Sequence, residues 1–314
     1  MATVPGQLSV RAFGRTGLWV SSLGLGAGEI GGAAQDELDV EALLRTAVDC
    51  GVTLIDTARS YGLSEERIGR FVAPVRDAVV LSTKVGYGVA GVPDWTGECV
   101  RLGIDQALVR LATDRIDIVH LHSCPTEVLE RGDVVTALHD AKRAGKIRCA
   151  AYSGDNEPLA WAAASGQFDS LQLSWNLCDQ HAAAVIARAH EAGLGVIAKR
   201  PLGNAPWRFD DRPTGHEAEA YWVRWRELTT ASPGDAAPPD YTSLMDPVEL
   251  PWDEFAARFA AHYPGVSSAI IGTAKIPHLC HNAELVARGA LPEELIAAVR
   301  ARFQAVGAGW PGRI

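Results

Sequence analysis

The sequence predicts an α/β fold, a (β/α)8 TIM barrel that forms a single domain over residues 1–314. Eight short β-like runs alternate with amphipathic helical segments along the chain, and such alternation is typical of a parallel sheet. Most of the runs are nearly continuous in apolar residues, as expected of strands that helices cover on both faces. An open doubly wound sheet is the alternative, but it usually has about five or six strands and a GxGxxG turn. The run from Gly24 to Gly28 lacks that spacing, so the barrel is favoured.

The positions of the elements follow from the spacing of apolar residues. The expected strands are residues 20–26, 52–56, 78–84, 116–122, 147–153, 168–174, 194–199 and 266–272. Apolar residues recur at helical spacing from Val40 to Val48 and predict a helix that packs on the sheet. Gly51 follows this helix, where a left-handed cap is favoured. Further helices are expected at residues 99–112, 133–144 and 182–192.

Two segments depart from the repeat. Residues 8–20 read as a β-hairpin that turns near Gly14 to Gly17 and closes the floor of the barrel. Residues 204–250 follow the seventh strand, so in a barrel they would extend over the catalytic face as an inserted lid or substrate loop. An alternative interpretation is that Trp222 and Trp225, three residues apart, form one face of a helix that packs on the barrel.

The composition excludes several classes of protein. The charge sum of 29 basic and 38 acidic residues is −9, without a basic run, so we expect no nucleic-acid partner. No apolar stretch reaches the roughly 18 residues of a membrane span, and the N-terminus lacks the pattern of a signal peptide. The six cysteines are too widely spaced for a zinc ribbon or a CxxC pair. We therefore expect a cytoplasmic protein with reduced thiols. No feature predicts an oligomeric state.

Four ionisable residues are expected near the carboxyl ends of neighbouring strands, where barrel enzymes carry their active sites. Asp56, Lys84 and His122 end three successive strands, and Tyr61 follows Asp56 by five residues. A nearby ammonium makes a phenol a better acid, and a carboxylate keeps that ammonium charged. The set suits protonation of a carbonyl oxygen as it becomes an alkoxide. None of these residues supplies a hydride, so a nicotinamide cofactor would be needed.

These residues lie in motifs that resemble those of the aldo-keto reductase family. GVTLIDTARSYGLSEERIG (51–69) resembles the segment in which an Asp is followed after five residues by a Tyr. The other matching segments, in family order, are LSTKVG (81–86), RIDIVHLHSCP (115–125), GKIRCAAYSG (145–154), LQLSWNL (171–177), VIAKRPLGN (196–204) and AIIGTAKIPHLCHN (269–282). The resemblance covers nearly the whole chain.

The resemblance implies a catalytic tetrad formed by Asp56, Tyr61, Lys84 and His122. Tyr61 would be the general acid in reduction of an aldehyde or ketone, or the base in oxidation of an alcohol or sugar. Asp56 and Lys84 would tune it, and His122 would orient the carbonyl. The resemblance also implies NAD(P)H binding without a Rossmann fold. The matching cofactor positions are Ser153 and Gln172 for the carboxamide, Leu202 and Gly203 for the pyrophosphate, and Gly272, Thr273, Lys275, His278 and Asn282 for the adenosine end.

The chain departs from the family pattern at the cofactor positions. Gly154 stands where an Asn is usual, and Lys199 replaces the Tyr that commonly stacks on the nicotinamide. Gly272 and His278 stand where many NADPH-dependent members carry Lys and Arg, but Lys275 remains to meet a 2′-phosphate. We therefore expect NADPH as the cofactor, with NADH as the alternative.

Other functions compete with this interpretation. His120 and His122 face the same way on one strand, as in barrel metallohydrolases. In those enzymes the pair ends the first strand, whereas here it ends the fourth, so we expect no metal site. A second alternative is a regulatory or structural member of the same fold that binds cofactor without turnover.

The expected substrate is a small carbonyl compound or sugar. Trp95, in the loop that begins at Tyr87, would form an apolar wall of the substrate pocket together with Trp207 and Trp310.

Overall fold

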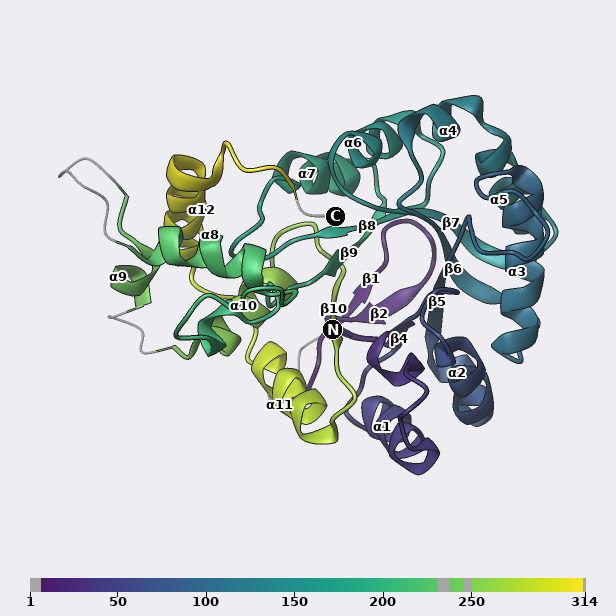
Figure 1. Ribbon diagram of the computed structural model, residues 1–314, viewed down its shortest axis with the longest axis horizontal. Helices are drawn as coiled ribbons and strands as arrows, with labels where there is room; N and C mark the ends of the chain where they lie inside the picture. Colours follow the sequence, from purple (N-terminus) through teal and green to yellow (C-terminus); the bar gives the residue numbers. More distant parts are fainter. Residues whose placement is uncertain (1–6, 231–237, 246–249, 313–314) are drawn as a thin grey trace.

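The computed structural model describes residues 7–230, 238–245 and 250–312 and contains a closed, eight-stranded parallel barrel (Figure 1). Each strand pairs with the next in chain order, and the last pairs with the first. Each expected run overlaps one of these strands, so the predicted fold class is confirmed. The strands are β3 (Leu23–Gly26), β4 (Leu54–Asp56), β5 (Val80–Val85), β6 (Ile116–His122), β7 (Ile147–Ser153), β8 (Ser170–Ser174), β9 (Gly195–Lys199) and β10 (Ser268–Gly272).

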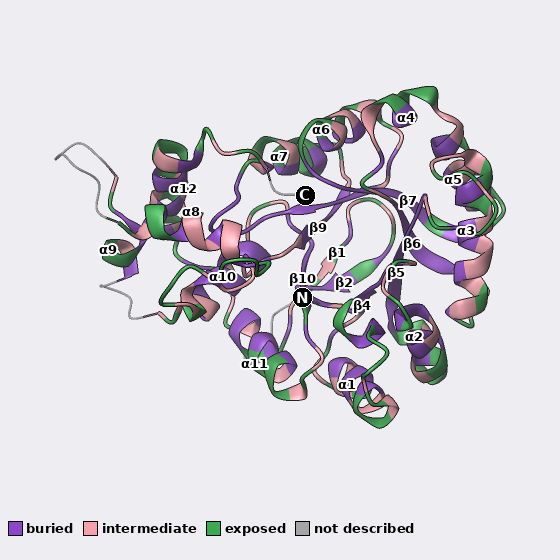
Figure 2. Ribbon diagram, in the orientation of Figure 1, coloured by how far each residue is buried: buried purple, intermediate pink, exposed green. Residues whose placement is uncertain are grey.

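Helices surround the barrel and turn their buried faces toward it (Figure 2). The first of them begins after Asp36, whose carboxylate accepts hydrogen bonds from two backbone amides of the first turn. The four helices that we predicted, α1, α3, α5 and α7, are present. The helices are α1 (Glu37–Asp49), α2 (Ser64–Val72), α3 (Gly97–Arg110), α4 (Thr126–Arg131), α5 (Asp133–Arg143), α6 (Asn156–Ser165), α7 (Ala183–Glu191), α8 (Glu219–Thr229), α9 (Tyr241–Met245), α10 (Trp252–Ala261), α11 (Ile276–Ala287) and α12 (Glu293–Gly307), with 3-10 turns at η1 (Glu29–Gly31), η2 (Ala73–Ala78) and η3 (Pro206–Arg208).

The predicted N-terminal hairpin closes the floor of the barrel. Its strands β1 (Val10–Ala12) and β2 (Trp19–Ser21) pair antiparallel. Phe13, at the turn, is fully buried and packs in a cluster with barrel residues such as Ile118. Its ring lies so close to Gly195 that a Cβ there would come within 2.6 Å of it. The floor is therefore filled by side chains, and the opposite end is left to carry the site.

The described part of residues 204–250 forms η3, α8 and α9, which lie with α12 to one side of the barrel (Figure 1). Trp225 is buried, and its ring packs edge-on against Trp252 of α10 at 4.1 Å between centroids. Trp222 is half-buried and donates its indole hydrogen to the backbone oxygen of Phe209. A helix that packs through Trp225 thus matches the alternative interpretation of this segment. The lid role stays a prediction, and residues 231–237 and 246–249 of it lie outside the described residues.

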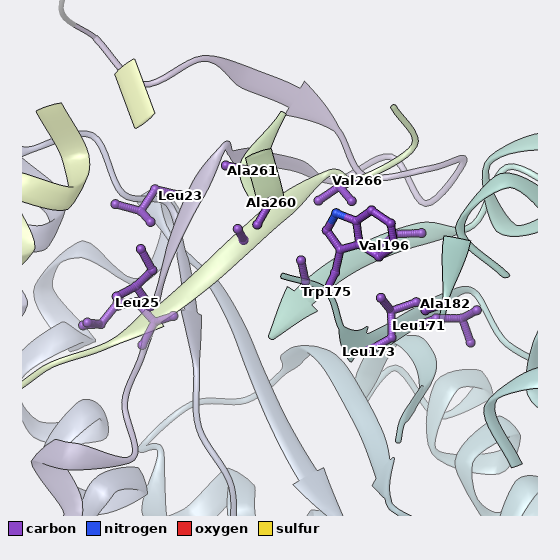
Figure 3. Close-up of a cluster of buried hydrophobic side chains, with 14 of the residues drawn as sticks. Leu23, Leu25, Leu171, Leu173, Trp175, Ala182, Val196, Ala260, Ala261 and Val266 are labelled. Atoms are coloured by element: carbon purple, nitrogen blue, oxygen red, sulfur yellow. The ribbon is translucent and has the colours of Figure 1, made fainter. Parts of the chain in front are cut away.

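The main core lies between the barrel wall and the helices. Trp175, directly after β8, is fully buried there, with centroid distances of 4.2 Å to Tyr263 and 5.6 Å to Phe259. Figure 3 shows its indole among small and branched side chains of β8, β9 and α10. Trp175 is therefore a packing residue. Among the described residues, no helix is long and apolar enough to cross a membrane.

Candidate active site

A buried ion pair lies at the centre of the site. Asp56 ends β4 and Lys84 lies near the end of β5, and both side chains are 2% exposed. Lys84 Nζ lies 2.6 Å from Asp56 Oδ2 and donates a second hydrogen bond to the backbone oxygen of Thr57 at 2.8 Å. Asp56 Oδ1 accepts from Ser82 Oγ at 2.7 Å and from Gln172 Nε2 at 2.9 Å. Both oxygens of the Asp56 carboxylate accept hydrogen bonds, so the carboxylate is fixed. The fixed carboxylate in turn holds the Lys84 ammonium in one place.

Both members of the pair are charged at neutral pH. Burial is the largest influence and acts to raise the pKa of Asp56, but the charge of Lys84 together with the hydrogen bonds from Lys84 and Ser82 holds that pKa below its usual value. Burial acts to lower the pKa of Lys84, but Asp56 and a hydrogen bond with Tyr61 leave it raised. The site therefore presents a fixed ammonium beside a phenol.

Tyr61 reaches this ammonium from the loop between β4 and α2. Lys84 Nζ lies 4.8 Å from the centre of its ring. The backbone of this loop lies very close to η1. A Cβ on Gly31 would come within 1.7 Å of the Tyr61 backbone oxygen, so only a glycine fits at that position. The Tyr61 ring also meets the His122 ring edge-on, with centroids 6.1 Å apart. All members of the predicted tetrad are thus brought together.

His122 ends β6 and is neutral at pH 7. Burial, followed by the charge of Lys84, lowers its pKa to about 3. Its Nδ1 lies 2.7 Å from the hydroxyl of Tyr87, whose ring stacks on the imidazole. From the sequence alone, Tyr87 is expected only to begin a loop that lines the substrate pocket. Its contact with His122 joins two loops and has no signature in a linear pattern.

The two predicted carboxamide-binding residues lie beside the tetrad. Ser153 ends β7 in register with His122 of β6 and with Gln172 of β8. Ser153 Oγ donates to Gln172 Oε1 at 2.8 Å, and Gln172 passes a hydrogen bond on to Asp56. Both side chains are buried. The side chains of Ser153 and Gln172 can both donate and accept hydrogen bonds, so they are suited to bind a carboxamide at the mouth of the barrel.

The remaining predicted cofactor residues lie on two neighbouring connections. Leu202 and Gly203 belong to the turn after β9, where Gly203 has a φ of +53°. Gly272 ends β10, and the Lys275 amide donates to Thr273 Oγ1 at 3.0 Å as α11 begins. On that helix, Asn282 Nδ2 donates to the backbone oxygen of His278 at 2.7 Å. The barrel strands all run parallel, and both connections follow the carboxyl ends of their strands, so they begin at the same end of the barrel as the tetrad.

Lys199, at the end of β9, forms a second ion pair. Its Nζ lies 2.7 Å from Asp155 Oδ2, and the Asp155 carboxylate also accepts the backbone amide of Ser174. Burial lowers the pKa of Lys199 despite the neighbouring carboxylate. Where the family pattern has a stacking Tyr, this chain thus has a half-buried, paired cation.

His120 lies deeper than His122 in the barrel. It is fully buried, its Nε2 lies 3.1 Å from Ser82 Oγ, and burial lowers its pKa to about 4. Through Ser82 it supports the hydrogen-bond network around Asp56. Within the described ranges, no group of three or more His, Cys, Asp or Glu residues could hold a metal ion.

The three tryptophans predicted for the substrate pocket have different surroundings. Trp95 meets the ring of Tyr87 at 5.6 Å and is thereby connected to the tetrad. Trp207 packs on Trp225 of α8, and Trp310 packs on Phe303 of α12. Trp95 is thus adjacent to the site, and a substrate contact of the other two stays a prediction.

Comparison with known proteins identifies the family. Residues 22–302 match the model of the Aldo/keto reductase family. The chain therefore belongs to the aldo/keto reductase family, whose members are oxidoreductases.

Individual relatives agree with this assignment. The chain is 34% identical to L-galactose dehydrogenase of Arabidopsis thaliana over 159 residues, which is 47% of this chain and 49% of that protein. The match thus spans about half the length of that relative. The identity to the oxidoreductase YqkF of Bacillus subtilis is 25% over 92% of this chain and 95% of that protein.

Solved structures show the same fold. A protein from Pseudomonas aeruginosa is 29% identical, with a TM-score of 0.68 over 89% of this chain and 94% of that chain. The holo form of an aldo-keto reductase from Bacillus halodurans has a TM-score of 0.75 at 20% identity, over 94% of this chain and 96% of that chain.

Proposed function

We propose that this protein is an NAD(P)H-dependent reductase of an aldehyde or ketone, or in the reverse direction a dehydrogenase of an alcohol or sugar. The observation that carries the proposal is the Lys84–Asp56 pair beside Tyr61 and opposite the neutral His122. A phenol next to a fixed ammonium is an acid suited to protonating a developing alkoxide.

In reduction, Tyr61 gives its hydroxyl proton to the substrate oxygen. The Lys84 ammonium stabilises the phenolate that remains, and Asp56 keeps that ammonium charged and in place. His122, being neutral, offers a hydrogen bond that orients the carbonyl without adding a charge. The nicotinamide cofactor, when bound, supplies the hydride.

The residues at the mouth of the barrel fit a nicotinamide dinucleotide. Ser153 and Gln172 form a buried polar pair that matches an amide in hydrogen-bonding capacity. The family resemblance gives the turn at Leu202 and Gly203 to the pyrophosphate, and a glycine there would allow an anion to approach the main chain closely. Lys275 offers a cation for a 2′-phosphate, which supports NADPH as the preferred cofactor, with NADH as the alternative.

A sugar or aromatic carbonyl is the substrate class that these surroundings favour. Trp95 and Tyr87 provide an aromatic wall beside His122, and aromatic faces bind both rings and sugars. The similarity to L-galactose dehydrogenase supports testing aldoses first.

The proposal is tested with the purified chain and a substrate panel. Reduction of aldehydes and ketones is followed by the loss of NADPH or NADH absorbance, and oxidation of aldoses, L-galactose included, by its gain. We expect turnover of at least one member. Saturable cofactor binding without turnover across the panel would instead support a regulatory member of the family.

A further inference from the structure

The loop after β5 brings a second phenol to the candidate active site. The Tyr87 hydroxyl lies 2.7 Å from His122 Nδ1 and 3.3 Å from Ser60 Oγ. Its ring stacks on the imidazole, with centroids 5.5 Å apart and 25° between the planes. We propose that Tyr87 is a positioning residue, which donates a hydrogen bond to His122 Nδ1 and so keeps the imidazole hydrogen on Nε2. This inference rests on the proposed function and assigns a further residue to it.

The direction of the hydrogen bond follows from its chemistry. Neutral imidazole has one donor nitrogen and one acceptor nitrogen, while a phenol can donate and accept. A separation of 2.7 Å is shorter than the ordinary N–H···O distance of about 2.9–3.0 Å and is common for O–H donors. A phenol, with a pKa near 10, is also a much better donor than the N–H of neutral imidazole. The Tyr87 hydroxyl has a single hydrogen, and its 3.3 Å contact with Ser60 Oγ is the longer and weaker of its two contacts, so that hydrogen is assigned to the bond with His122 Nδ1.

The choice of nitrogen determines what His122 does to a substrate. Because Tyr87 engages Nδ1, Nε2 is the nitrogen left for a substrate oxygen. With the hydrogen on Nε2, the ring donates to a carbonyl oxygen and adds to the polarisation that Tyr61 provides. With the hydrogen on Nδ1, Nε2 would present a lone pair and repel that oxygen. Tyr87 therefore fixes the productive tautomer.

The ring of Tyr87 is itself held in place. Trp95 packs edge-on against it at 5.6 Å between centroids, and the Trp95 amide donates to the backbone oxygen of Gly86 at 2.7 Å. Ser60 directly precedes Tyr61 in the sequence. The Tyr87 hydroxyl thus also connects the loop of the general acid to His122.

The first test removes the hydroxyl and keeps the ring. Tyr87→Phe is expected to lower kcat about tenfold, the usual size for one lost hydrogen bond, while Kd for NADPH changes less than about twofold. Tyr152→Phe is the matched control. Its hydroxyl donates to the backbone oxygen of Cys124 at 3.1 Å, outside the tetrad, so kcat should stay unchanged.

The second test reads the tautomer directly, without turnover. In ¹⁵N NMR spectra, with the His122 signals assigned from the His122→Gln spectrum, the wild type should show hydrogen on Nε2 and an accepting Nδ1. Tyr87→Phe should shift the Nδ1 resonance and populate the other tautomer. Hydrogen on Nδ1 in the wild type, or unchanged resonances in the variant, would overturn the inference whatever happens to kcat. A wild type with the expected tautomer but no turnover would instead contradict the proposed function alone.

Discussion

Replacing Lys84 with methionine removes the cation that balances Asp56 while it keeps much of the side-chain volume. The two side chains are 2% exposed and 2.6 Å apart. Removing one partner of a buried pair costs about 3–5 kcal/mol, because the other charge stays buried without compensation. Asp56 keeps its hydrogen bonds from Ser82 and Gln172. We therefore expect the lower end, a loss of about 3 kcal/mol in the free energy of unfolding at neutral pH.

The loss should depend on pH in a defined direction. In the wild type the pKa of Asp56 is lowered, so its ionisation contributes stability that is present above about pH 4 and is lost as the pH falls further. In Lys84→Met the hydrogen bonds from Ser82 and Gln172 remain, but without the ammonium burial prevails and raises that pKa, so stability is lost as the pH rises above about 4. Urea unfolding should show that the difference in the free energy of unfolding between the wild type and Lys84→Met grows from about pH 5 to about pH 8.

The matched control removes the buried charge as well. Asp56→Asn combined with Lys84→Met leaves no ion in the site, so the double variant should recover much of the lost stability. A single variant as stable as the wild type, or a double variant no more stable than the single one, would refute the reasoning.

Three other predictions concern the general acid, the cofactor and the buried histidines. Tyr61→Phe should lower kcat about 10²- to 10⁴-fold with Kd for NADPH within a few-fold; steady-state kinetics and titration check this, and unchanged turnover would remove Tyr61 from its role. Lys275→Ala should weaken NADPH about tenfold and NADH less than about twofold; equal losses in binding titrations would place Lys275 away from the phosphate. Burial lowers the pKa of His120 and of His262 to about 4 and that of His122 to about 3, so the unfolded chain takes up their protons first. As the pH falls from about 6.5 to about 4, each histidine should therefore lower the free energy of unfolding by up to about 1.4 kcal/mol per pH unit. Urea unfolding across this range measures the slope. A free energy of unfolding that does not change with pH would contradict burial of the neutral rings.

The barrel and the clustering of Asp56, Tyr61, Lys84 and His122 could be predicted because both depend on local patterns. Apolar runs mark strands, and the last polar residue of a strand marks the active end of a barrel, which is where Asp56 and His122 lie. The contact between Tyr87 and His122 could not be predicted, because it depends on the path of a loop after β5.

Long-range packing accounts for the other differences. Asp155 follows β7 and Lys199 ends β9, so the two pair across β8, which lies between those strands, and the spacing of the two residues along the chain contains no sign of this contact. From the sequence, Trp225 fits a lid or a packed helix equally well. Its contact with Trp252 of α10 shows that it packs, and that contact depends on how α10 folds. Periodicity gives the face of a helix but not the surface that covers it.

The most direct test of the account is a titration of the protein with NADPH and with NADH, followed by the fluorescence of its nine tryptophans. We expect saturable quenching by both, with tighter binding of NADPH and a larger loss of NADPH than of NADH affinity in Lys275→Ala. If neither nucleotide binds, the nicotinamide site does not exist in this chain and the proposed reduction is wrong.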